Sequence, residues 1–184
     1  MLAELNQGVM FLGVVFSRLL QTIKLERDAF VWMDFNDRAT GDAAILVAVT
    51  QLLLTLGLGV SLLDLLHPTT LFRVLLGALF MWVIYSGAVY AIGRFLLDAS
   101  GQYAIYLRIT GFAYPTLLLI VFTALVIPIG FLAFLVGGAW FVVVVANGLT
   151  YTVDLPLQKS VLAAVGGLVL LVVVQEILGS IRGF

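Results

Sequence analysis

The sequence predicts an all-α protein: a polytopic membrane helix bundle of five transmembrane helices, preceded by an interfacial amphipathic helix. Hydrophobic residues make up 63% of the 184-residue chain and charged residues 10%, and the mean hydropathy is +1.20. Soluble domains carry roughly 25% charged residues and about half apolar ones. Lipid rather than water is therefore expected to surround this chain. The apolar residues also gather in five long runs, and the region before these runs has helical spacing.

Residues 1–42 are predicted to form a lead-in at the cytoplasmic interface. Apolar side chains recur there at three- and four-residue steps, which places them on one helical face: Val9, Leu12, Phe16, Leu19 and Ile23. The alternative is that residues 9–23 form a re-entrant or sixth span. About fifteen residues is short for a crossing, so the sequence favours the interfacial helix.

Basic and aromatic side chains in the lead-in predict contact with the membrane surface. Lipid headgroups are the expected neighbours of three basic residues: Arg18, Lys24 and Arg27. Aromatic rings follow at Phe30, Trp32 and Phe35, and rings of this kind prefer the headgroup level.

Residues 43–184 are predicted to form the transmembrane domain. Each apolar run is long enough to cross about 30 Å of hydrocarbon at about 1.5 Å per residue. The predicted spans are 43–66, 71–96, 104–127, 130–151 and 157–181. Turn-forming residues separate them, among them Pro68, Pro128 and Pro156.

The charges of the connections predict the orientation. Seven of the nine basic residues lie before the first span or beside the second and fourth connections, and the other two are Arg73 and Arg182. By the positive-inside rule the amino terminus is then cytoplasmic and the carboxyl terminus outside. An odd number of spans agrees with this orientation.

Several classes of function lack the residues they need. The net charge of −1 argues against nucleic acid as a partner. The chain has no cysteine, and its single histidine, His67 before Pro68, fits a turn better than a ligand for a porphyrin metal. No catalytic triad, glycine-rich phosphate loop or pair of intramembrane carboxylates is present. The sequence therefore predicts a protein that is not an enzyme and has no cofactor.

Small residues in the third and fifth spans mark expected helix contacts. Ala163 and Gly167 have the spacing of a small-xxx-small contact. Gly111 permits close packing, and Pro115 removes a backbone hydrogen bond and kinks its helix. Such positions usually pack within one chain, and contact with a partner is the alternative.

Polar and charged residues near the span ends leave further alternatives open. Gln175 and Glu176 are candidates for a helix or partner contact, and the Glu176 carboxylate either snorkels to the surface or enters a buried contact or an ion-linked role. Asp64 is expected at the interface with Arg73 as a candidate partner. Arg108, at the cytoplasmic end of the third span, is expected to reach lipid headgroups.

The most specific pattern is SGQYAIYLRITGFAYPTLLL, which begins at Ser100. It contains a polar loop with Gly101, an aliphatic-Arg step at Arg108, and a Gly-aromatic-x-x-Pro motif made by Gly111, Phe112 and Pro115. Trp140 follows in the fourth span, and the lead-in contains RLLQTIKLERDAFVWMDF. In these features the chain resembles the Yip-domain family of membrane proteins.

This resemblance implies a cytoplasmic amino-terminal segment and five helical spans. Eukaryotic members associate with Rab GTPases and help organise endoplasmic reticulum and Golgi membranes, often as oligomers. Their acidic-aromatic Gly-Pro motif ahead of the first span is missing here, where MDFNDRATGD stands. The departure makes a Rab-type GTPase partner doubtful and favours a prokaryotic relative in the cytoplasmic (inner) membrane.

The predicted function is that of a non-enzymatic, Yip-like scaffold that organises membrane proteins or lipid. Its expected partners are the lipid bilayer, other integral membrane proteins and further copies of itself. An accessory subunit within a larger respiratory or photosynthetic complex is the alternative. A small transporter or channel has less support, because the spans show neither an inverted repeat nor a polar midplane cluster.

Overall fold

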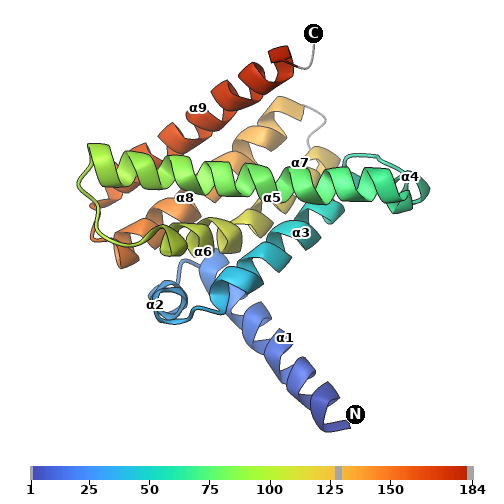
Figure 1. Ribbon diagram of the computed structural model, residues 1–184, viewed down its shortest axis with the longest axis horizontal. Helices are drawn as coiled ribbons and strands as arrows, with labels where there is room; N and C mark the ends of the chain where they lie inside the picture. Colours follow the sequence, from blue (N-terminus) through green and yellow to red (C-terminus); the bar gives the residue numbers. More distant parts are fainter. Residues whose placement is uncertain (1, 127–129, 182–184) are drawn as a thin grey trace.

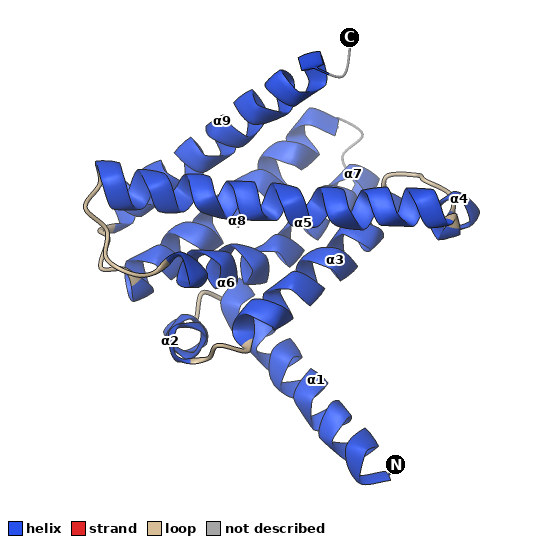
Figure 2. Cartoon of the chain, viewed as in Figure 1, coloured by secondary structure: helices blue, strands red, loops and turns tan. Residues whose placement is uncertain are grey.

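The computed structural model describes residues 2–126 and 130–181, with side chains for residues 13–126 and 130–177. Every regular element in these ranges is helical (Figure 1, Figure 2). Five helical segments are long and apolar enough to cross a membrane: Ala39–Gly57, Pro68–Leu96, Tyr103–Val126, Gly130–Thr152 and Leu157–Ile177. The helix α1 (Leu2–Ile23) precedes them. The predicted fold class, a five-span helical bundle with an amino-terminal helix, is confirmed.

Two of the spans change helix type along their length. The second span is α5 (Pro68–Ala91) followed by the π-helical turn η1 (Ile92–Leu96). The third comprises α6 (Tyr103–Ala113), the 3-10 segment η2 (Tyr114–Leu118) and α7 (Leu119–Val126). The remaining elements are the spans α3 (Ala39–Gly57), α8 (Gly130–Thr152) and α9 (Leu157–Ile181), and the short helices α2 (Arg27–Phe35) and α4 (Leu62–Leu66).

The first span is shorter than its apolar run. It was predicted at 43–66, but α3 ends at Gly57 and the chain turns through Gly59, whose φ is +98°. Ser61 then caps α4 by accepting a hydrogen bond of 3.1 Å from the Asp64 amide. Hydropathy does not detect this break, because the residues on both sides of the turn are equally apolar.

The connections that carry most of the basic residues meet at one end of the bundle, here called the basic end and marked by Arg94, Arg108 and Lys159. The Ser100 amide donates to the Val153 carbonyl at 3.3 Å, which joins the second connection to the fourth. Which side of the membrane this end faces stays a prediction. Arg73 lies near the start of α5, at the opposite end, whereas Arg182 and the turn predicted at Pro128 are outside the described residues.

The core is concentrated around α6, next to the basic end. Its largest fully buried side chains include Tyr106, Phe112 and Ile109 from α6, and Phe30 and Met33 from α2. The sequence predicts that Phe30 contacts the membrane surface, but its side chain is fully buried inside the protein. The amphipathic α2 turns Phe30 inward against Gly148 of α8, where a Cβ would approach the ring to 3.0 Å.

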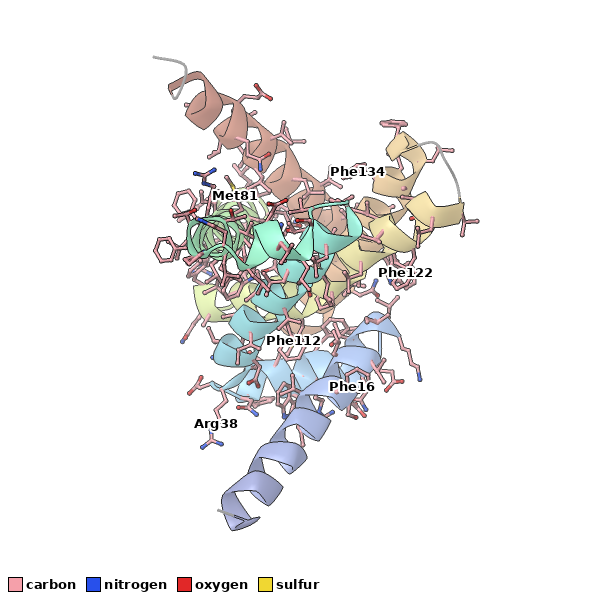
Figure 3. The ribbon with its side chains drawn as sticks, turned by 90° about the vertical axis from the view of Figure 1, so that its right-hand side faces the viewer. Phe16, Arg38, Met81, Phe112, Phe122 and Phe134 are labelled. Carbon is pink, nitrogen blue, oxygen red and sulfur yellow. The ribbon has the colours of Figure 1, made fainter. Side chains whose placement is uncertain are left out.

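The helix α1 leaves the bundle at α2 and α6 and runs across the direction of α3 and α9 (Figure 1). Phe16, labelled in Figure 3, is 60% exposed on it. A helix that crosses the direction of the spans and exposes apolar rings is suited to lie in the plane of a membrane surface. The side chains of Val9 and Leu12 lie outside the described residues, so the interfacial placement of α1 stays a prediction.

Candidate functional site

Arg108 joins the third span to the connection between α2 and α3. Its side chain is only 8% exposed. Nη1 donates to the carbonyls of Met33 and Asp34 at 2.9 and 3.2 Å, and Nε donates to Thr40 Oγ1 at 2.9 Å. Nη2 lies 2.7 Å from the Asp37 carboxylate. Arg108 and these four partners are called the Arg108 clamp below.

The Arg108 clamp corrects the prediction that Arg108 reaches lipid headgroups. The carbonyls of Met33 and Asp34 belong to the last turn of α2, where a helix has no donors of its own for its carbonyls. A guanidinium carries five donors and satisfies several such groups at once. Arg108 therefore points into the protein. Arg38, by contrast, points away from the bundle (Figure 3).

The three basic residues expected at headgroups differ in their surroundings. Arg18 lies 5.5 Å from the centre of the Trp32 ring and donates to Gln21 Oε1 at 2.9 Å, so its guanidinium is already engaged. Lys24 and Arg27 are exposed, and their side chains form no hydrogen bond or ion pair with any described residue. These two side chains are free to contact a surface outside the chain.

Gly111 lies at a close contact between α6 and α3. A Cβ at this position would lie 2.5 Å from the Cβ of Ala43 and 3.1 Å from its Cα. Pro115 follows in η2 and is buried. The missing donor of a proline is tolerated where the helix tightens to 3-10 geometry and neighbours surround it.

Ala163 and Gly167 both lie on packed parts of α9, and Gly167 faces α5. Ala163 is fully buried, and a Cβ on Gly167 would lie 2.5 Å from Val89 Cγ2. The Tyr85 hydroxyl donates to the Ala164 carbonyl at 3.1 Å in the same contact. Both small residues are therefore occupied by packing within the chain.

Unlike Ala163 and Gly167, the side chains of Gln175 and Glu176 are exposed on α9. Gln175 Nε2 lies 3.8 Å from the sulfur of Met81 on α5. Glu176 forms no hydrogen bond or ion pair with a described residue. Its carboxylate is therefore not part of a buried interhelical contact in the described bundle.

A buried polar network between α5 and α6 was not found from the sequence. Trp82 Nε1 donates to the Leu107 carbonyl at 3.2 Å and to Thr110 Oγ1 at 3.0 Å, and the hydroxyls of Ser86 and Thr110 are 2.6 Å apart. The spacing of Trp82 and Ser86, four residues apart on an otherwise apolar helix, was a signal that could have revealed it.

Some polar groups inside the spans connect helices, whereas others, such as the Asn147 amide, bond to a carbonyl of their own helix. Tyr114 donates to Gln51 Oε1 at 2.8 Å, which joins η2 to α3. Among the described residues, every buried side-chain nitrogen or oxygen has a hydrogen-bond partner. The same residues contain no group of three or more His, Cys, Asp or Glu side chains that could hold a metal ion.

Comparison with known families gives a match that covers most of the chain. A family model described as Yip1 domain matches residues 26–177. The matched region begins at the N-cap residue of α2 and ends within α9, so it includes the Arg108 clamp and leaves out α1. Neither the curated proteins nor the solved structures give a match. The chain belongs to the Yip1 domain family of integral membrane proteins.

Proposed function

We propose that this protein is a non-enzymatic scaffold that organises membrane proteins or lipid through its amino-terminal platform. The platform consists of the described part of α1, α2 and the connection to α3, residues 13–38. The Arg108 clamp is the observation that carries the proposal. A buried arginine that binds backbone carbonyls 74 and 75 positions earlier in the chain keeps α2 in a fixed place on the bundle.

The exposed side of the platform supports a contact role. Phe35 is 84% exposed at the end of α2, and Phe16 is exposed on α1. Lys24 and Arg27 lie in the same segment, and their side chains have no partner among the described residues. Aromatic rings next to free cations suit the surface of a membrane or of another membrane protein.

Two further features support a scaffold rather than a catalyst or a transporter. The buried polar side chains of the described spans all have hydrogen-bond partners within the protein, either on their own helix or on a neighbouring one. Glu176, the carboxylate considered for an ion-linked role, is exposed on α9. We place the platform on the cytoplasmic side of a prokaryotic inner membrane, because the basic residues favour that orientation and the Rab-associated motif is missing.

Site-specific photo-crosslinking of the full chain in its membrane tests the proposal. A photoreactive phenylalanine analogue replaces Phe35 on the platform or, as the matched control, Leu63 on α4, because these two side chains are 84% and 83% exposed. We expect the variant at 35 to give a defined adduct with another copy or with one membrane protein. The variant at 63 is expected to give no such adduct.

Other results would contradict the scaffold proposal. A chain that purifies in mild detergent as a monomer by light scattering, without adducts at position 35, argues against it. Recovery of a stoichiometric, cofactor-bearing complex would favour the accessory-subunit alternative. Flux into liposomes that Glu176→Gln abolishes would favour transport.

A further inference from the structure

A cavity of about 410 Å³ lies among α3, α5, η2, α8 and α9. Its lining includes polar side chains from three elements, Gln51, Arg73 and Gln175, and large apolar or aromatic ones such as Tyr85 and Phe141. The volume falls in the range of about 300–1,000 Å³ that is typical of small-molecule sites. A lining of both kinds suits an amphiphile, which carries a polar head and an apolar tail.

A groove of about 750 Å³ adjoins this cavity on the surface of α5. The groove is lined by one face of the helix, including Thr69, Phe72 and Leu76. Both spaces share Arg73, Gly77 and Met81. Figure 3 shows Met81 on the side of α5 that faces α9. The two spaces therefore meet along α5, with a single arginine beside both.

The glycines at these spaces differ from the glycines of the helix contacts. A Cβ on Gly77 or on Gly138 of α8 would have no atom within 4 Å, whereas one on Gly111 or Gly167 would meet a neighbour at 2.5 Å. Gly77 and Gly138 therefore do not bring helices together. Their missing side chains enlarge the space next to them.

Arg73 provides a positive charge that the described residues do not neutralise. It is exposed, and its guanidinium forms no hydrogen bond or ion pair within the described part of the chain. Its expected partner, Asp64, instead accepts a hydrogen bond of 2.7 Å from the Ser61 hydroxyl. Glu176 carries the other nearby carboxylate on α9 and lines neither space. A guanidinium is well suited to bind a phosphate group.

The length of the cavity along α5 matches one leaflet of a bilayer. Arg73 and Tyr85 are twelve positions apart on this helix, which corresponds to about 18 Å at about 1.5 Å per residue. The hydrocarbon core of a bilayer is about 30 Å thick, so one leaflet contributes about 15 Å. Arg73 lies in the second turn of α5, where a phospholipid headgroup would lie.

We propose that the cavity and the groove together bind one anionic phospholipid with two acyl chains. Its phosphate contacts Arg73, one chain enters the cavity, and the other lies along the groove on the far side of Gly77. The site is independent of the proposed scaffold role, since lipid binding is measured on the isolated chain without a partner.

Native mass spectrometry of the full-length protein tests this site. The protein is released from nanodiscs that contain dioleoylphosphatidylglycerol, dioleoylphosphatidylcholine or an equal mixture of both. We expect one retained lipid, with phosphatidylglycerol about tenfold preferred. Arg73→Gln is expected to remove this preference, because it removes the charge-assisted contact to phosphate. Gly77→Leu combined with Gly138→Leu is expected to reduce the retention of phosphatidylglycerol and of phosphatidylcholine alike, because the new side chains fill part of the cavity and the groove.

Two matched variants control for changes unrelated to the site. Lys159→Gln also removes one exposed cation, but at the basic end, and Gly87→Leu adds the same side chain to α5 at a position with no neighbour within 4 Å. Both are expected to retain lipid as the unchanged protein does. The proposal is overturned if Arg73→Gln keeps the preference or if the Leu pair retains lipid normally. It is also overturned if the variant with both Gly77→Leu and Gly138→Leu keeps its lipid but no longer binds a second copy of the chain.

Discussion

Arg108 Nη2 and the Asp37 carboxylate are 2.7 Å apart, yet Arg108 is buried and the side chain of Asp37 is fully exposed. Water screens the carboxylate, so this ion pair contributes little on its own. The same guanidinium also binds two backbone carbonyls and the Thr40 hydroxyl. The stabilising effect of the Arg108 clamp is therefore expected to come mainly from these buried and partly buried acceptors.

Arg108→Gln is expected to lower the free energy of unfolding by about 1–3 kcal/mol, because it leaves the buried Met33 carbonyl and the partly buried Asp34 carbonyl without this donor. Asp37→Asn, which leaves those carbonyls satisfied, is expected to have a much smaller effect. Thermal unfolding of both variants in the same detergent measures the difference. Equal losses for the two variants would show that the ion pair, and not the carbonyl contacts, dominates.

Gly111→Ala is expected to destabilise the bundle by about 1–3 kcal/mol, because the new methyl group meets both Cβ and Cα of Ala43. Gly87→Ala is the matched control within a helical span, since a Cβ there has no neighbour within 4 Å. Its stability is expected to stay the same or to rise slightly, as alanine favours helix over glycine. If Gly111→Ala unfolds at the same temperature as Gly87→Ala, the close contact between α3 and α6 is not rigid.

Thr110→Val is expected to cost about 1 kcal/mol, since it keeps the shape of the side chain but removes the hydroxyl that Trp82 and Ser86 share. Thr55→Val is the control, because the Thr55 hydroxyl bonds only to the Gln51 carbonyl of its own helix. The blue-shifted fluorescence of a buried tryptophan is also expected to change in the Thr110 variant alone. An unchanged melting temperature would mean that the network adds nothing to stability.

The orientation can be tested directly, because the chain has no cysteine and every introduced thiol is unique. Lys24→Cys and Lys159→Cys are expected to be protected from a membrane-impermeant maleimide in intact cells. His67→Cys, in the connection at the opposite end, is expected to react. Labelling of Lys24→Cys and Lys159→Cys on different sides would contradict the predicted orientation.

The sequence predicts the spans well wherever polar or proline residues interrupt the apolar pattern. The fourth span was predicted at 130–151 and is observed at Gly130–Thr152, ending just before a polar connection. The first span was misjudged because Leu58, Val60, Leu62 and Leu63 keep the hydropathy high through the turn at Gly59. Two glycines followed by a capping serine were the local signals of that break.

The site residues were harder to predict because their partners are distant in the chain. A lone arginine near the end of an apolar run looks the same whether it snorkels to headgroups or binds inside the protein. Two acceptors of Arg108 are backbone carbonyls, and because every residue has one, the sequence does not indicate which carbonyls bind the guanidinium. Likewise, the sequence does not show that Gly111 packs against α3 whereas Gly77 borders open space, since this depends on which helices become neighbours.

The Arg108 clamp connects parts of the chain that the ribosome makes at very different times. The Met33 and Asp34 carbonyls at the end of α2 cannot form their hydrogen bonds with Arg108 until residue 108 has been synthesised and the third span has inserted. We expect trypsin to cleave at Lys24 and Arg27 in nascent chains that stop before residue 108, and to cleave there more slowly in longer ones. The helix α2, which is made before the five spans, would thus reach its final position only after the third span has inserted.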